Sequence, residues 1–594
     1  MNGQPSSYDR QYTVEELLTF LYGVEKARPW IPRFEALIRR YAPSVLPATS
    51  PDQPRPWLSE KDAMLITYPD QVQEPGVPTL QTLHDFLQKY LYGLISAVHI
   101  LPFFPFSSDD GFAVIDYLQV NPPYGTWEHI QQLSQIFRLM FDAVINHTSS
   151  QCPWFRAFLQ DEPEFRDFYI AIEGNPDLST VVRPRTTPLL TEFPSATGPR
   201  KIWTTFSADQ VDLNYHNPKV LYRVIEILLE YTRRGASFLR LDAIAYLWKE
   251  LGTSCIHLPQ THAVVQLIRA ILDRTAPHVL LITETNVPHL ENISYFGDGY
   301  HEAQLVYNFA LPPLVLHAFL RQDATVLTQW AQTLRPPSPA TTFFNFLASH
   351  DGIGLNPARG IVPESEIEFL VRTCLEHGGY VSHKTNPDGT ESPYELNIVY
   401  FDALSNPNAD EPQGRQVARF LSAHGIMLAL AGMPGIYFHS LFGSRNDRAA
   451  VEATGIKRRI NRAKFTRTAL EQELGDPTSR RFAVFQGFRH LLQARQSHSA
   501  FAPNAPQRIL TLHPGVFAVL RGQEPYQRIL CLHNVTDHPI PCALPHELDW
   551  KTSRPIARHL ETGIAPTTMT LPPHPSLTLE PYEVLWLIEI QREF

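Results

Sequence analysis

An arginine and two acidic residues with suitable spacing for acid–base chemistry lie near the ends of short apolar segments. Arg240 and Asp242 are two residues apart in SFLRLDAI, so on a β-strand both side chains would point to the same face. An arginine beside a carboxylate lowers its pKa and keeps it ionised, as a covalent nucleophile must be. Glu284 lies near the end of VLLITET, and we expect its pKa to be raised so that it can donate a proton. Enzymes that cleave glycosidic bonds typically use two carboxyl groups with different pKa values.

Two further segments end in residues of the same kinds. Asn146 and His147 end DAVINH, and His350 and Asp351 end LASHD. A carboxylate after a strand often only caps the next helix, and that explanation is adequate for any one of these sites. It fits poorly for three carboxylates, two histidines and an arginine at corresponding places, so we expect these side chains to meet in one site.

Eight short apolar runs could be the strands that bring these side chains together. They are residues 63–68, 97–104, 139–146, 237–244, 279–285, 303–309, 343–350 and 435–438. Buried parallel strands have this composition, and helix-like segments separate most of them. The pattern predicts an α/β fold, a (β/α)8 TIM barrel, in which the carboxyl ends of the strands converge on one mouth. A doubly wound open sheet is the alternative, but no GxGxxG follows any of the runs.

The remaining segments predict how the rest of the chain is organised. Residues 58–500 would form the barrel, with two insertions on the loop face at 148–217 and 353–414. Residues 1–57 predict a helical extension, where Thr13 and Glu16 form a capping-box pattern and the Pro-rich stretch 47–56 is a linker. Residues 505–594 have short apolar runs between Pro, Gly and Asn turns, which predicts an antiparallel β domain.

Composition excludes several classes of function. The formal net charge is −10, whereas sequence-independent nucleic-acid binding needs a basic footprint. The longest apolar stretch, 425–438, is too short to cross a bilayer. Five cysteines without a CxxC pair, and an N-terminus without a secretory pattern, favour the cytoplasm. Without an HExxH motif or a tight histidine cluster, we expect no catalytic metal and no cofactor.

The four motifs together resemble the α-amylase superfamily, glycoside hydrolase family 13. DAVINH, RLDAIAY, TETN and FLASHD match its four conserved regions in order. The resemblance implies retaining chemistry on α-glucosides, with Asp242 as nucleophile, Glu284 as general acid/base and Asp351 as transition-state stabiliser. Arg240, His147 and His350 would bind the sugar or orient the carboxylates. Many amylases hold calcium with the Asn of DAVINH, but His147 is followed here by TSSQCPWF, and we do not expect calcium.

A narrower resemblance is to the sucrose phosphorylase subfamily, through LITYPDQ, HILPFFPFSSDDGF, SPYELN and GSRND. It implies that Asp109 and Arg458 form the pair that closes the glucose pocket. The implied side wall is Phe112, Phe206, Gln210 and Tyr246, although core packing would also account for the aromatic residues. The implied phosphate contacts are Arg185 and Tyr394, and Lys384 is a further cation in the second insertion, where a solvated loop charge is the alternative.

Within that subfamily the chain looks most like the glucosylglycerate phosphorylases. It departs from the sucrose enzymes by ETNVPH after Glu284, by Glu395 in place of a glutamine, and by the N-terminal extension. The branch implies cleavage of 2-O-α-glucosyl-D-glycerate by phosphate, with inorganic phosphate as co-substrate and a glucoside as the only other small-molecule partner. Sucrose, sucrose 6′-phosphate or glucosylglycerol phosphorolysis, α-glucoside hydrolysis, and a non-catalytic amylase-like binding module remain alternatives. The chain could be a monomer or a homodimer.

Overall fold

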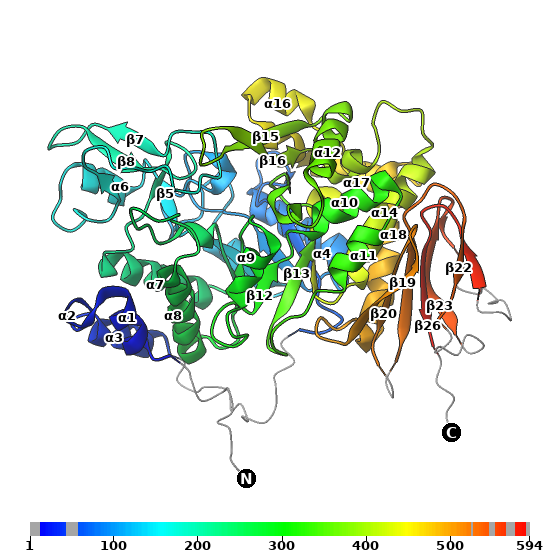
Figure 1. The fold of residues 1–594 in the computed structure, drawn as a ribbon, viewed down its shortest axis with the longest axis horizontal. Helices are drawn as coiled ribbons and strands as arrows, with labels where there is room; N and C mark the ends of the chain where they lie inside the picture. The colour runs from blue at the N-terminus through cyan, green and yellow to red at the C-terminus, as the bar shows by residue number, and fades with distance from the viewer. Residues whose placement is uncertain (1–11, 43–57, 524–526, 546–552, 566–575, 590–594) are drawn as a thin grey trace, which may run out of the picture.

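Eight parallel strands close into a barrel at the centre of the computed structural model, which describes residues 12–42, 58–523, 527–545, 553–565 and 576–589 (Figure 1). Around the barrel the strands are β1 (Met64–Thr67), β17 (Met433–Tyr437), β13 (Thr342–Phe346), β12 (Leu305–Tyr307), β11 (Leu280–Thr283), β10 (Ala236–Leu241), β4 (Arg138–Ala143) and β3 (Ala97–Ile100). Each falls within or overlaps one of the eight apolar runs. The predicted (β/α)8 barrel is confirmed, and the doubly wound sheet is wrong, because β1 pairs with both β3 and β17 and closes the sheet.

Helices cover the outside of the barrel, so its strands are buried on both faces, which explains their nearly continuous apolar composition. The covering and connecting helices are α4 (Thr79–Leu91), α5 (Trp127–Ser134), α7 (Pro218–Arg233), α8 (Pro259–Thr275), α9 (His289–Ile293), α10 (Leu311–Arg321), α11 (Thr325–Ala331), α14 (Gln413–Ala429), α15 (Phe438–Leu441), α16 (Arg448–Thr454), α17 (Arg467–Gly475) and α18 (Arg480–Gln496).

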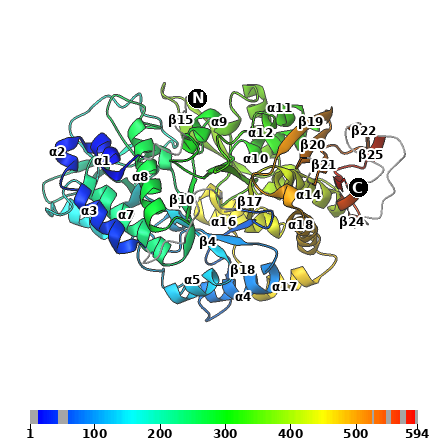
Figure 2. The same ribbon diagram turned by 90° about the horizontal axis from the view of Figure 1, so that it is seen from below.

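Within residues 12–42, three helices precede the barrel: α1 (Val14–Tyr22), α2 (Val24–Ala27) and α3 (Ile31–Tyr41). Thr13 and Glu16 form the expected capping box. The buried faces of α1 and α3 pack on α7 and α8 (Figure 2), and the Tyr22 hydroxyl donates to the carbonyl oxygen of Tyr215 at 3.1 Å. The N-terminal segment is therefore attached to the side of the barrel. The expected linker at 47–56 lies outside the described residues.

Both long segments on the loop face carry small antiparallel sheets. The first holds α6 (Pro153–Leu159), the pair β5 (His147–Ser149) and β9 (Gln210–Asp212), and the sheet of β6 (Ala171–Ile172), β8 (Arg200–Trp203) and β7 (Leu190–Phe193). The second holds α12 (Glu364–Glu376), α13 (Tyr400–Leu404) and the sheet of β14 (Ile353–Gly354), β16 (Glu391–Asn397) and β15 (Tyr380–Thr385). A further short pair joins β2 (Val72–Gln73) and β18 (Phe465–Thr466).

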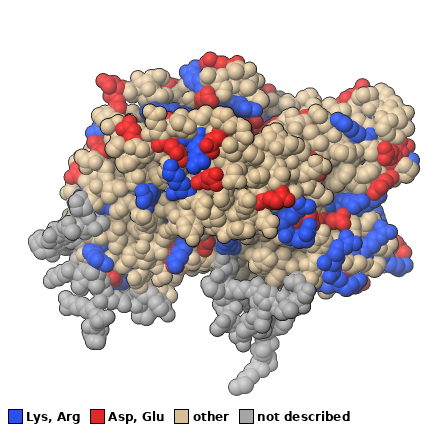
Figure 3. Space-filling view, turned by 180° about the vertical axis from the view of Figure 1, so that it is seen from behind, with Lys and Arg blue, Asp and Glu red and all other residues tan. Residues whose placement is uncertain are grey.

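The C-terminal part is a β structure that packs on α14 and α18. Its larger sheet runs β19 (Gln507–His513), β20 (Val516–Arg521), β21 (Ile529–Asn534), β26 (Val584–Ile588), β23 (Arg554–Leu560), β24 (Gly563–Ile564), and β22 (Ile540–Ala543) pairs with β25 (Ser576–Leu579). In the part of the chain that is described, no helix is long and apolar enough to span a bilayer. Basic and acidic side chains lie next to each other on the face in Figure 3, unlike a continuous nucleic-acid footprint.

Candidate active site

A pocket opens among the carboxyl ends of the barrel strands and the two long loop segments. It is lined by Asp109, Phe112, His147, Arg185, Phe206, Gln210, Asp242, Ala243, Ala245, Tyr246, Glu284, Thr285, Asn286, His350, Asp351, Tyr394 and Arg458. Of the residues expected at the site, Arg240, Lys384 and Glu395 do not line it. Arg240 and Glu395 instead form ion pairs with residues that line it, Asp242 and Arg458. Lys384 lies on β15. Burial lowers the pKa of its ammonium group, and the negative charge of Glu291 partly opposes that shift.

The deepest part of the pocket is built around one arginine, and we call Asp142, Arg240, Asp242 and Glu284 the inner cluster. Arg240 on β10 donates to Asp242 at 2.7 Å and to Asp142, and its second terminal nitrogen lies 3.8 Å from Glu284. Asp142 also bonds His99 Nε2 at 2.6 Å. Arg240 and Asp142 are paired in register on neighbouring strands. The barrel thus fixes the guanidinium, which in turn orients Asp242.

Burial raises the pKa of both pocket carboxyls in the inner cluster. It raises the pKa of Glu284 to about 7, with Arg240 opposing and the negative charges of Asp242 and Asp351 adding to the rise. The sequence predicts a lowered pKa for Asp242, and this is wrong. Burial and the negative charge of Asp142 outweigh the effect of Arg240 and raise the pKa of Asp242 above its ordinary value. Arg240 still favours ionised Asp242 over ionised Glu284, since it donates directly to Asp242. The geometry therefore favours an ionised Asp242 next to a protonated Glu284.

A strained backbone residue helps to place Glu284. Ala243 has φ +48°, in the left-handed region that non-glycine residues rarely adopt. In that conformation its backbone N–H donates to Glu284 Oε2 at 3.0 Å. The residue that follows Asp242 in the chain thus holds the Glu284 carboxyl group through its backbone N–H.

A second group of charges lies beside the inner cluster, and we call Asp351, Glu395 and Arg458 the outer cluster. Arg458 pairs with Asp351 at 2.6 Å, and with Glu395 through two nitrogens at 2.9 and 2.7 Å. Glu395 also accepts from the backbone N–H of Gly352 at 3.0 Å. Burial alone would raise the pKa of Asp351, but Arg458, Arg462 and Arg240 lower it below its ordinary value. Asp351 is therefore held as an anion beside Glu284.

Asp109 and Arg458 both line the pocket, but the ion pair of Asp109 is with a different arginine. Asp109 pairs with Arg462 at 3.4 Å, and Arg462 also contacts Asp110 at 2.8 Å. Arg458 lies within the short helical segment Lys457–Asn461, and Arg462 follows its end. Arg462 comes within 3.8 Å of Asp351 but otherwise meets different carboxylates from Arg458. Arg458 is committed to Asp351 and Glu395, and Arg462 is the arginine that the sequence analysis missed.

Aromatic and polar side chains form the side wall. Phe112 stacks on His350 with ring centroids 4.6 Å apart, and Phe206 meets Tyr246 edge to face at 5.5 Å. Gln210 Nε2 lies 3.2 Å from His147 Nε2 and 3.5 Å from Asp109. These side chains line the pocket, and Phe112 and Tyr246 are at the same time part of the buried apolar core. A flat apolar surface with hydrogen-bonding groups around it suits a sugar ring.

Arg185 brings a positive charge to the pocket from the first long loop segment. Its guanidinium carbon lies 5.7 Å from the centre of the Phe206 ring and 5.4 Å from that of Tyr394. Its one recorded hydrogen bond among the described residues is to the carbonyl oxygen of Pro184. Most of its donors are therefore available to an anion in the pocket.

Comparison with known proteins identifies the family. The catalytic-domain model of alpha amylase matches residues 73–352. A glucosylglycerate phosphorylase of Allomeiothermus silvanus is 51% identical, covering 97% of this chain and 98% of its own length. The chain belongs to the glucosylglycerate phosphorylase family. The family's member from Spirochaeta thermophila is 50% identical, over 97% of this chain and 98% of its own.

A solved structure supports the same family relationship. The sucrose 6F-phosphate phosphorylase of Thermoanaerobacter thermosaccharolyticum is 26% identical, with a TM-score of 0.70 over 80% of this chain and 94% of that one. The resemblances to the α-amylase superfamily, to the sucrose phosphorylase subfamily and to its glucosylglycerate branch are thereby confirmed.

Other residues of this family member were not predicted from sequence. Asp142 could have been found, because DAVINH begins with it and it shares a strand face with neighbouring Arg240. Asn286 lines the pocket with a side-chain oxygen that has no partner among the described residues. Nothing in the spacing of Arg462 or Asn286 marks them as site residues.

Lys249 is a further residue that was not predicted, and it contacts the Asn of DAVINH. Its ammonium group lies 2.8 Å from Asn146 Oδ1 and 2.5 Å from Asp212 Oδ2. Asn146 and Asp212 are themselves joined at 3.1 Å. The carbonyl and carboxylate oxygens that a hard cation would use are here turned toward a lysine. Across the described residues, no group of three or more His, Cys, Asp and Glu side chains is arranged to hold a metal ion.

Proposed function

We propose that this protein is a retaining glucosylglycerate phosphorylase, which converts 2-O-(α-D-glucosyl)-D-glycerate and phosphate into α-D-glucose 1-phosphate and D-glycerate. One observation carries the proposal. Arg185 places an available guanidinium in the same pocket as an oriented carboxylate, Asp242, and a carboxyl group with a raised pKa, Glu284. The glycoside chemistry and the anion-binding chemistry are thus combined in one cavity. The high identity to named glucosylglycerate phosphorylases supports the choice of acceptor.

In the first step Asp242 attacks the anomeric carbon of the glucosyl unit while Glu284 gives its proton to the departing glycerate oxygen. The bond from carbon to Asp242 forms as the glycosidic bond breaks. Arg240, which donates to Asp242 at 2.7 Å, keeps the nucleophile ionised and aimed. Asp351, held as an anion by Arg458 and Arg462, would stabilise positive charge that develops on the sugar.

In the second step an oxygen of phosphate attacks the same carbon and the bond to Asp242 breaks, while Glu284 takes the proton of the attacking phosphate oxygen and is restored. Two inversions leave the α configuration unchanged. Phosphate and the glycerate carboxylate would use the same cationic side of the pocket in turn, with Arg185 and Tyr394 as the proposed contacts. Asn286 offers an unpartnered oxygen to a substrate hydroxyl. Neither step needs a cofactor, and a monomer or homodimer in the cytoplasm is the setting that we propose.

An acceptor screen in the synthetic direction tests the function. Phosphate release from α-glucose 1-phosphate is measured with D-glycerate, glycerol, fructose and fructose 6-phosphate. We expect D-glycerate to give the highest kcat/KM, and a higher value for any of the others would contradict the assigned acceptor. Glucosylglycerate cleavage without phosphate is the control, because equal rates with and without phosphate would identify a hydrolase.

A further inference from the structure

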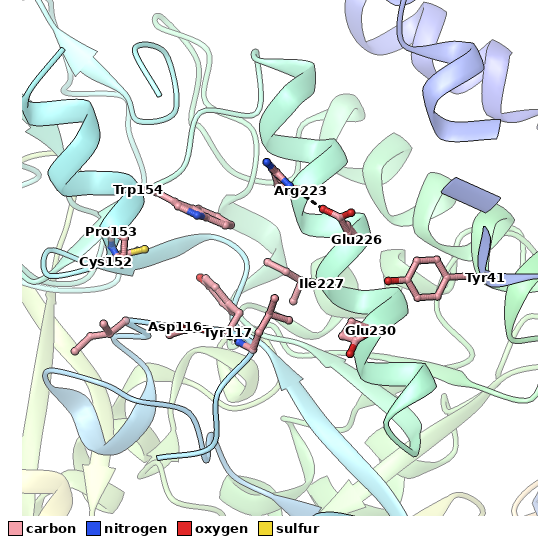
Figure 4. A pocket seen from close by; sticks show the side chains of 12 residues that line it. Tyr41, Asp116, Tyr117, Cys152, Pro153, Trp154, Arg223, Glu226, Ile227 and Glu230 are labelled. Atoms are coloured by element: carbon pink, nitrogen blue, oxygen red, sulfur yellow. Dashed lines mark hydrogen bonds and ion pairs between the residues drawn. The ribbon is translucent and has the colours of Figure 1, made fainter. Parts of the chain in front are cut away.

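A second cavity, of about 510 Å³, lies between the N-terminal helices and the barrel (Figure 4). Tyr41 at the end of α3 contributes one wall, and residues 115–118, the start of α6 and one face of α7 contribute the others. It shares no lining residue with the catalytic pocket. Tyr117 separates the two, since its ring lines this cavity while its hydroxyl donates to the carbonyl oxygens of Val144 and His147. The volume is within the range of about 300–1,000 Å³ typical of small-molecule sites.

One side of the cavity is apolar and aromatic. Trp154 is half-buried, and its ring lies 5.8 Å from that of Tyr117 at an interplanar angle of 28°. Ile227 on α7 adds an aliphatic surface, and in Figure 4 these three side chains border the same space. No tryptophan lines the catalytic pocket. An aromatic surface of this kind suits the C–H face of a pyranose ring.

Three carboxylates line the cavity, and each already accepts hydrogen bonds: Asp116 accepts from the Leu118 N–H at 2.8 Å and from the Gln119 amide at 3.0 Å, and the two glutamates pair with arginines. Glu226 accepts from Arg223 at 3.0 Å and from Arg40 at 3.5 Å. Glu230 pairs with Arg233 and Arg234 at 2.6 and 2.5 Å. A charged ligand would therefore find no uncompensated opposite charge among these pairs. The paired carboxylates keep spare lone pairs, which can accept from the hydroxyl groups of a neutral ligand.

The geometry points to a second carbohydrate site, and we propose that this cavity binds a neutral pyranose sugar. The ring would lie against Trp154, and its hydroxyls would meet the Arg223–Glu226 pair and the Tyr41 hydroxyl, which points toward the cavity in Figure 4. The proposal does not depend on which acceptor the catalytic pocket uses, because the two sites have separate walls.

Equilibrium dialysis with labelled D-glucose tests the site by counting bound sugars per chain. Leu118 lines the cavity and is 47% exposed, so Leu118→Trp should fill the cavity without disturbing the core. We expect two glucose equivalents for the wild type and one for Leu118→Trp, with phosphorolysis retained. Leu375→Trp is the matched control, because Leu375 on α12 is 54% exposed and lines neither cavity. It should still bind two equivalents.

Tyr41→Phe removes a single hydroxyl and keeps the test decisive if the tryptophan variant does not fold. It should weaken the binding of the second glucose about fivefold, which corresponds to the loss of one hydrogen bond worth roughly 1 kcal/mol. One equivalent in the wild type would overturn the proposal, as would two unchanged equivalents in both Leu118→Trp and Tyr41→Phe. Displacement of the second glucose by an equal concentration of glycerol would show that a pyranose ring is not what the cavity recognises.

Discussion

The inner and outer clusters each hold an arginine between carboxylates, but they do so at different depths. The Arg240 side chain is 2% exposed and its partners come from adjacent barrel strands or the residues that follow them. The Arg458 side chain is 17% exposed, and its partners Asp351 and Glu395 come from separate parts of the loop face. A closed barrel can impose the first arrangement through strand register alone. The second depends on how the long loop segments fold over the mouth.

Replacing Asp242, the proposed nucleophile, should have the largest effect. Asp242→Asn removes the attacking oxygen charge but keeps the side-chain shape, so we expect phosphorolysis to fall by about 10⁴-fold or more. Stopped assays of α-glucose 1-phosphate formation would measure the loss. The exposed Asp388→Asn serves as control. Near-normal turnover by Asp242→Asn would remove the inner cluster from the mechanism.

Loss of the cation on the loop face should cost less. Arg185→Ala removes a charge-assisted contact worth about 1.5–3 kcal/mol, so the KM for phosphate should rise roughly 10- to 150-fold. The glucosyl-enzyme should still form, which a burst of D-glycerate release would show. Arg183→Ala is the matched control, because Arg183 lies on the same segment and bonds Thr187 outside the pocket. Phosphate kinetics as in the wild type would mean that another cation holds the anion.

The pH profile reports on the inner cluster alone. In the proposed mechanism Glu284 must be protonated to give a proton to the leaving glycerate, and its pKa is raised to about 7. The kcat/KM for glucosylglycerate should therefore fall about tenfold per pH unit above pH 7, and it should fall again at acid pH as Asp242 becomes protonated. Glu284→Gln should abolish this alkaline limb together with most activity. A decline centred below pH 5 would indicate that Glu284 is ionised in the free enzyme at neutral pH.

The contrast between the clusters also explains what could be predicted from sequence. Apolar strands followed by Arg240, Asp242 and Glu284 predict both the barrel and the carboxylates, since strand periodicity fixes which side chains share the mouth. The role of Arg462 was not predicted, and neither was the pairing of Arg458 with Asp351 and Glu395. Both depend on loops without periodicity. Arg458 and Arg462 are four residues apart in a run of basic residues, and only the folded loop shows which carboxylate each one meets.

The smallest effect should come from Glu395 in the outer cluster. Glu395 is 1% exposed and accepts from three donors, namely Gly352 N–H and two nitrogens of Arg458. In Glu395→Gln the amide has one oxygen to accept with, and its NH₂ group must face one of those donors. Leaving such a donor without an acceptor costs about 1–3 kcal/mol. Asp351 still holds Arg458 at 2.6 Å, so we expect only about a tenfold loss in kcat/KM for glucosylglycerate. The exposed Glu391→Gln on the same strand is the matched control, and equal values for the two variants would show that the outer cluster does not need the carboxylate.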